Sequence, residues 1–147
     1  MPDLEREPEI RIERPENPLE PELLGRLRQE LERCPDVAFA HLPQVMVEGQ
    51  QDRPGLVLFV WLTPASLSSL RAALRLVTEA VARVLPSDRF LDVVVLNSAP
   101  ELLDQVEAAK CLLVERDPDE RRRALEAAAE NGDSHPEASR GPWWWPF

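Results

Sequence analysis

The uninterrupted apolar run from Leu56 to Leu62 constrains the fold of this chain more than any other segment. A strand with one exposed face alternates apolar and polar residues, whereas a strand covered on both faces is apolar throughout. The run is also much shorter than the ~20 apolar residues that cross a bilayer. We therefore expect residues 56–62 to form the central strand of a sheet whose two faces are both covered.

Shorter segments on either side of this run alternate between strand and helix patterns. Apolar segments that predict strands lie at residues 37–42, 90–96 and 111–114. Segments with helical spacing or capping signals lie at residues 18–33, 64–85, 98–110 and 120–130. The alternation predicts an α/β fold, a mixed sheet of about four strands with helices packed on it as a two-layer sandwich.

Two capping signatures mark helix starts in the C-terminal half. Ser98 and Glu101 have the spacing of a capping box, and Asp117 is followed by a Pro and then by Glu120. The helix expected after Asp117 has Leu125 as its only large apolar residue. We therefore expect this last helix to pack weakly and to fray at its end.

Shifts in composition divide the chain into three parts. Residues 1–17 are charged and Pro-rich and predict a flexible segment, although residues 10–12 have the pattern of a short strand. Residues 18–130 carry the predicted elements and form a single α/β domain. Residues 131–147 join a polar linker to an aromatic end, and we expect this part to be flexible.

Charge and cysteine content restrict the environment and the partners. The formal net charge of -10 would repel phosphates, which excludes nonspecific nucleic-acid binding and disfavours an anionic membrane surface. Cys34 and Cys111 do not have metal-ligand spacing and favour two reduced thiols. The N-terminal residues show no signal-peptide pattern. These features predict a cytoplasmic protein without a metal or a cofactor.

The order of these segments resembles that of a known domain. The segments that carry the likeness are Pro35–Leu42, the strand Leu56–Leu62, the helix end Val84–Pro86, the strand Leu91–Leu96 and the closing strand Cys111–Arg116. In this order they resemble the C-terminal domain of the enhanced serine sensitivity proteins of bacteria. The resemblance covers residues 18–117 and implies an α/β sandwich, but it implies no particular reaction.

A second family has a similar order of elements, the minimal nucleotidyltransferases of the DNA polymerase beta superfamily. Their chemistry needs a Gly-Ser turn, two carboxylates on the next strand and a third on a later strand to bind divalent metal. Here the turn reads Gln44–Val45, residues 56–62 hold no acid, and only Asp92 stands at the third position. This resemblance implies a catalytically dead copy. An active metal-dependent enzyme would need Asp92 together with loop acids such as Glu48 or Asp52.

Other polar residues favour structural interpretations. His41 lies between apolar residues of a predicted strand and is interpreted as a core or edge histidine with satisfied hydrogen bonds. The segment Glu115–Asp117 is interpreted as the end of the last strand and the cap of the next helix. The run Arg121–Arg123 beside acidic residues is typical of a solvated helix face. No catalytic cluster follows from these positions.

The helix predicted over residues 64–85 carries a stripe of apolar residues at steps of three and four. The stripe consists of Leu67, Leu70, Leu74, Val77, Val81 and Val84. Two interpretations remain open at this point. The helix lies across the sheet of its own domain, or the stripe is the face of an obligate homodimer.

The aromatic C-terminal end indicates binding. Half of the aromatic residues, which are four Trp and four Phe with no Tyr, lie in the last five positions. These positions are Trp143, Trp144, Trp145, Pro146 and Phe147. Aromatic surface on a mobile tail is costly to leave in water, and indoles supply large contact areas to an interface. We expect a non-catalytic domain that binds a protein partner through this tail. The alternatives are folding back onto the same domain or a dimer mate, and contact with a membrane.

Overall fold

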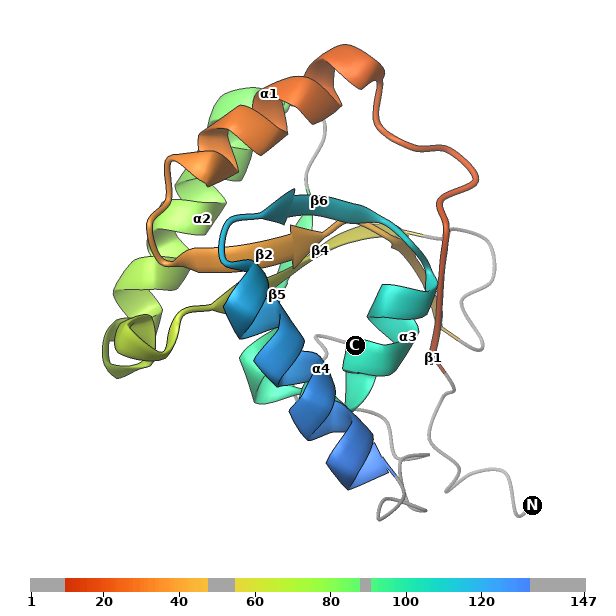
Figure 1. Ribbon diagram of the computed structural model, residues 1–147. Helices are drawn as coiled ribbons and strands as arrows, with labels where there is room; N and C mark the ends of the chain where they lie inside the picture. Colours follow the sequence, from red (N-terminus) through yellow and green to blue (C-terminus); the bar gives the residue numbers. More distant parts are fainter. Residues whose placement is uncertain (1–9, 48–54, 88–90, 133–147) are drawn as a thin grey trace, which may run out of the picture.

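The computed structural model describes residues 10–47, 55–87 and 91–132 (Figure 1). The strands are β1 (Ile10–Glu13), β2 (Val37–His41), β3 (Gln44–Val47), β4 (Gly55–Leu62), β5 (Asp92–Val95) and β6 (Leu112–Glu115). The α-helices are α1 (Pro21–Glu32), α2 (Leu70–Val84), α3 (Leu103–Ala108) and α4 (Pro118–Gly132). Short 3-10 helices are η2 (Pro64–Ser69), η3 (Leu96–Ser98) and η4 (Pro100–Leu102). The expected mixed α/β class is confirmed.

Strand β4 is the centre of a mixed sheet. Along one edge it pairs antiparallel with β2 and then with β3, with His41 opposite Phe59 and Gln44 opposite Leu56. Pro43, which has no N–H to donate, separates β2 from β3 along this edge. Along the other edge β4 pairs with β5 in parallel. Strand β6 pairs with the far edge of β2, and β1 pairs with the far edge of β3.

Both faces of β4 are buried, as the apolar run predicts. Leu58 and Leu62 point into one cluster of apolar side chains, which also contains residues of α1 and α2. Val57 and Phe59 point into a second cluster, which also contains residues of α3 and α4. Helices therefore cover both faces of the sheet, as Figure 1 shows, and the fold has three layers instead of the expected two. The central strand needs cover on both sides because its side chains alternate between the two faces.

Helix α2 lies across the sheet of its own domain, which is the first of the two interpretations of its apolar stripe. Val77, Val81 and Val84 are buried in the core, and Leu74 is partly buried against it. The stripe as a whole is therefore not an exposed dimer face. The exceptions are Leu67, which is 45% exposed, and Leu70, which is 36% exposed. They lie in η2 and at the first residue of α2.

The N-terminal segment differs from expectation in its second half. Ile10–Glu13 pairs antiparallel with β3, and Ile12 is buried at 9% exposure. Residues 10–13 are therefore part of the sheet, as the strand pattern at residues 10–12 indicates, and Ile10 and Ile12 both pack against the second apolar cluster. Residues 1–9 and the linker and tail at 133–147 lie outside the described residues.

One of the two predicted caps forms. Asp117 caps α4, since its Oδ1 accepts a hydrogen bond of 3.1 Å from the backbone N–H of Glu120. The capping box at Ser98 does not form, because Ser98 is the last residue of η3 and no side chain caps η4 or α3. The chain reaches α3 through two short 3-10 helices instead.

Candidate functional site

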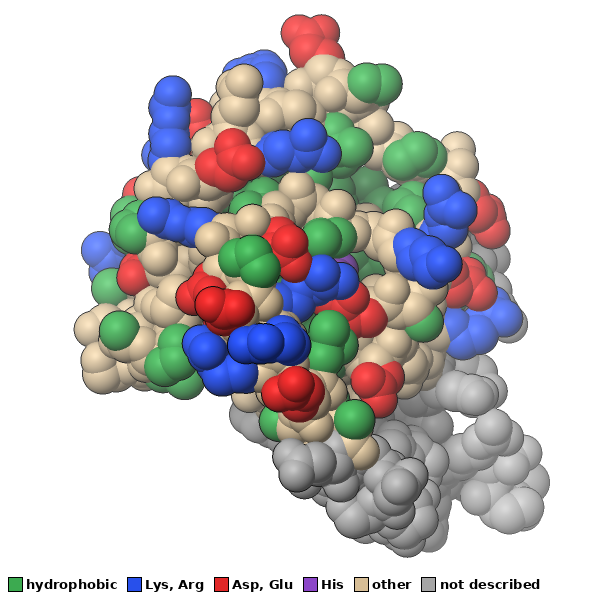
Figure 2. Space-filling model, viewed as in Figure 1, with side chains coloured by type: hydrophobic (Ala, Val, Ile, Leu, Met, Phe, Trp, Pro, Cys, Tyr) green, Lys and Arg blue, Asp and Glu red, His purple; other side chains and the backbone are tan. Residues whose placement is uncertain are grey.

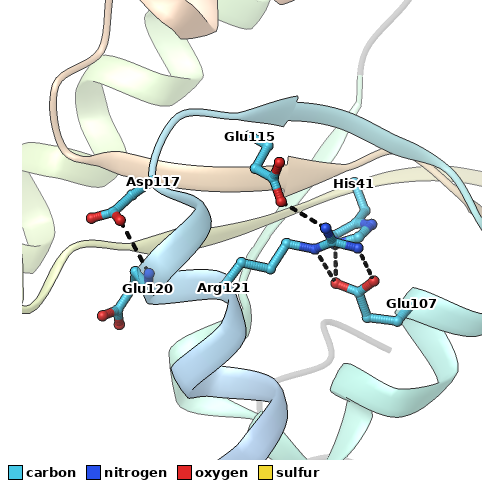
Figure 3. A network of polar contacts seen from close by, with 6 residues as sticks. All are labelled: His41, Glu107, Glu115, Asp117, Glu120 and Arg121. Carbon is cyan, nitrogen blue, oxygen red and sulfur yellow. Dashed lines mark hydrogen bonds and ion pairs between the residues drawn. The ribbon is translucent and has the colours of Figure 1, made fainter.

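Four charged or titratable side chains meet on the face of the sheet that α3 and α4 cover (Figure 3). His41 comes from β2, Glu107 from α3, Glu115 from the end of β6 and Arg121 from the second turn of α4. We call these four residues the α4 clamp. Figure 2 shows charged side chains of both signs over this side, with the histidine almost hidden behind them.

Arg121 is the centre of the α4 clamp. Its Nε donates to Glu107 Oε2 at 2.9 Å and its Nη2 donates to Glu107 Oε1 at 2.6 Å, so the pair is bidentate. Its Nη1 donates to Glu115 Oε2 at 2.6 Å. The hydrogen bonds to Glu107 raise the pKa of Arg121 above its already high value. One guanidinium thus joins α4 to both α3 and β6.

Glu107 is a carboxylate held in a largely buried position, with its side chain 15% exposed. Burial by itself raises the pKa of this carboxyl, but the hydrogen bonds and positive charge of Arg121, together with the closeness of the His41 ring, outweigh it. The net effect is that the pKa of Glu107 lies below its usual value. The group is therefore ionised at neutral pH and depends on Arg121 for compensation.

His41 is buried but its hydrogen bonds are not satisfied, so the expectation of a satisfied histidine is wrong in this respect. Its side chain is 1% exposed, and its Nε2 lies 3.1 Å from Glu107 Oε2. That contact lacks hydrogen-bond geometry, and Nδ1 has no polar partner either. Burial lowers the pKa of His41, although the Glu107 carboxylate acts in the opposite direction. The imidazole is therefore neutral at pH 7.

A second contact pins the first turn of α4. Trp61 Nε1 donates to Glu120 Oε2 at 3.0 Å, and Arg123 Nη2 donates to Glu120 Oε1 at 2.9 Å. The Trp61 ring stacks on Phe39 with centroids 5.7 Å apart, and Phe39 meets His41 edge-on at 5.6 Å. The aromatic side chains and the α4 clamp thus form one continuous layer beneath α4.

This geometry suits a structural role better than a catalytic one. A general base must reach a proton of its substrate, directly or through one water. His41 and Glu107 are covered by α3 and α4, and every charge of the α4 clamp is directed at another member of it. A substrate would have to displace α4 to reach the imidazole. The chemistry that remains is charge pairing that holds a helix onto a sheet.

Asp92, the candidate catalytic residue, lies apart from the α4 clamp at the start of β5. Its side chain is partly exposed, and its Cα partner in the sheet is Val57. In residues 10–47, 55–87 and 91–132, no group of three His, Cys, Asp or Glu side chains is placed to hold a metal ion. Glu48 and Asp52 lie outside the described residues, as do Trp143, Trp144, Trp145, Pro146 and Phe147.

The sequence matches no known family model, and searches of curated proteins and of solved structures found no match. Within the described part of the chain, no helix is both long and apolar enough to cross a membrane.

Sequence reasoning missed the α4 clamp because it treated Arg121–Arg123 as one solvated run. Arg122 and Arg123 are 65% and 58% exposed, but the side chain of Arg121 is only 26% exposed. The position of Arg121 in the helical repeat could have predicted its inward orientation. Arg121 is three residues before Ala124, which is buried, so it lies on the inward face of α4. A cation on an inward face needs a buried acid opposite it.

Proposed function

We propose that this chain is a non-catalytic protein-interaction module that binds a protein partner through Trp143–Phe147. The observation that carries the proposal is the cover on both faces of the sheet. The described helices cover both apolar clusters, and we take the three C-terminal indoles to act outside these cores. Aromatic side chains that the domain does not need for its own core are available to another protein.

The side chains of the domain give the proposal further support. In the described chain the charges around the buried His41, which form the α4 clamp, are occupied by their own ion pairs. The order of elements is also the one on which the resemblance to the C-terminal domain of the enhanced serine sensitivity proteins rests, and we include that kinship in the proposal. A cytoplasmic location belongs to it as well, supported by the free thiols of Cys34 and Cys111.

The chemistry of the tail defines the kind of surface that would receive it. Three indoles and a phenyl ring would bind best in an apolar groove of the partner, because buried aromatic anchors dominate the binding energy of most interfaces. The α-carboxylate of Phe147 would pair with a basic side chain or accept hydrogen bonds from backbone N–H groups at the end of that groove. We therefore expect a partner with an apolar groove that ends in positive charge.

A capture experiment with two baits tests this function. The full-length chain and a chain that ends at Pro142 are immobilised at equal density and exposed to the same cell extract. The truncation removes the three tail indoles and leaves the charged side chains unchanged. We expect proteins bound by the full-length bait to be lost from the shorter one. An identical set of bound proteins on both baits would contradict the proposal.

A further inference from the structure

Two exposed leucines form an apolar surface at the start of α2. Leu67 is 45% exposed and Leu70 is 36% exposed, and a spacing of three residues places them side by side. Leu74 follows one turn later and is partly buried. We call Leu67, Leu70 and Leu74 the α2 patch. Figure 2 shows hydrophobic side chains at the surface at the left of the view, where η2 and the start of α2 lie in Figure 1.

Two arginines border the α2 patch. Arg71 and Arg75 are exposed and lie one turn apart, next to Leu70 and Leu74 in the sequence. Neither arginine forms an ion pair with another residue in the described part of the chain. In a chain with a formal net charge of -10, an apolar surface with a positive border is a local exception. It matches an apolar ligand that carries negative charge.

The C-terminal tail of this same sequence is a ligand of that kind. Trp143–Phe147 supplies four aromatic rings and ends in the α-carboxylate of Phe147. We infer that the α2 patch receives the Trp143–Phe147 tail of a second copy of this chain. The rings would cover the leucines, and the carboxylate would pair with Arg71 and Arg75. The inference rests on the proposed function, because it takes the tail to be a docking peptide, and it names the docking surface.

The position of α4 favours a second copy over the same molecule. Helix α4 and helix α2 cover opposite faces of the sheet, and α4 ends at Gly132. The residues between α4 and the tail, 133–142, span at most about 35 Å when fully extended. Three packed layers are themselves roughly 20–30 Å thick. A path around the sheet edge would use nearly the whole linker and leave it few conformations. A tail that reaches a neighbouring molecule has no such restriction.

Sedimentation velocity of the full-length chain, from low micromolar to several hundred micromolar, tests the inference. One variant combines Leu67→Ser with Leu70→Ser, and a second combines Arg71→Glu with Arg75→Glu. The matched apolar control is Leu76→Ser, because Leu76 is 44% exposed on α2 but lies about 120° around the helix from Leu70. The matched charge control combines Arg26→Glu with Arg122→Glu, two exposed arginines on other helices.

We expect the full-length chain to self-associate and the chain ending at Pro142 to be monomeric. Both α2-patch variants should weaken self-association at least tenfold, and both controls should leave it within twofold of the original. Adding a synthetic peptide of residues 131–147 should dissociate the full-length assembly, and the same peptide with a C-terminal amide should do so several-fold less well.

Several outcomes would overturn the inference. A full-length chain that stays monomeric, or self-association that survives both α2-patch variants, excludes this docking surface. Tail indoles protected from iodide in a monomer, and exposed by Leu67→Ser with Leu70→Ser, would place the tail on its own molecule. In each case tail-dependent capture of another protein would leave the proposed function standing. If the truncated bait captures the same proteins as the full-length bait, the proposed function itself fails.

Discussion

At the scale of single residues, His41 is the most unusual group in the domain. Both of its nitrogens are buried without a hydrogen bond, which costs free energy that an apolar side chain would not lose. The folded state lowers its pKa through burial. On acidification the unfolded chain therefore binds a proton at His41 before the folded chain does. The stabilising contribution of the neutral imidazole is present above the unfolded pKa of about 6.5 and is lost as pH falls below it.

The variant His41→Leu tests this argument. We expect its free energy of unfolding at pH 7.5 to lie within about 1 kcal/mol of that of the unsubstituted protein, because an unsatisfied polar group is replaced by an apolar one. Between pH 6.5 and pH 5 the unsubstituted protein should lose stability, and the variant should lose distinctly less stability. Urea unfolding at each pH measures both quantities. Parallel loss of stability in the two proteins would show that His41 does not carry the effect.

Arg121 is the residue on which the α4 clamp depends. The change Arg121→Met keeps the length of the side chain but leaves Glu107 as a mostly buried carboxylate without its cation. We expect a loss of about 2 kcal/mol in the free energy of unfolding. The control Arg122→Met removes a 65% exposed arginine one position away and should cost at most about 0.5 kcal/mol. Equal effects of the two changes would contradict the inward role of Arg121.

Residue identities predicted the burial of His41 but not its neighbours. The apolar residues around it indicate a core position, and the structure confirms that position. Its contacts are Glu107 from α3 and, through Glu107, Arg121 from α4. These residues meet only after three elements have packed, so no local pattern contains the α4 clamp. The helical phase of Arg121 was the one usable signal.

At the scale of elements, α4 shows how polar contacts replace apolar ones. The expectation of a weakly packed helix rested on Leu125 as its only large apolar residue. The structure places Ala124 in the core and lets Arg121 and Glu120 bond to α3, β6 and β4. Small residues allow α4 to approach the sheet closely, and the charges then reach their partners. Apolar patterning alone underestimates a helix that is anchored in this way.

The C-terminal end of α3 carries a conformational cost that a substitution can remove. Lys110 follows α3 with a φ of 56°, in the left-handed region that favours glycine. The change Lys110→Gly should therefore stabilise the domain by about 1 kcal/mol. The control Lys110→Ala removes the same charge without relieving the backbone and should bring no gain. Thermal unfolding of the three proteins decides between them, and a gain with alanine equal to that with glycine would point to charge instead.

At the scale of the whole molecule, the apolar run of β4 predicted that both sheet faces are covered, and the structure confirms it. The alternation of strand and helix segments was interpreted as a two-layer sandwich, but α3 and α4 add a layer on the second face of the sheet. Strand neighbours were beyond local patterns as well. Strand β5 pairs with β4 in parallel, and β1 joins through β3, and these pairings depend on contacts between residues far apart in the chain.

The three-layer arrangement also makes a prediction about the tail. The described helices cover both faces of the sheet, so a chain that ends at Gly132 should keep its free energy of unfolding within about 0.5 kcal/mol of the full-length value. Urea unfolding at low micromolar concentration, followed by circular dichroism, measures this without interference from self-association. A loss of about 2 kcal/mol or more on truncation would mean that the tail completes the core of its own domain, because apolar burial of that size corresponds to a whole aromatic side chain. The tail would then be a structural element, and its role in binding another protein would have to be abandoned.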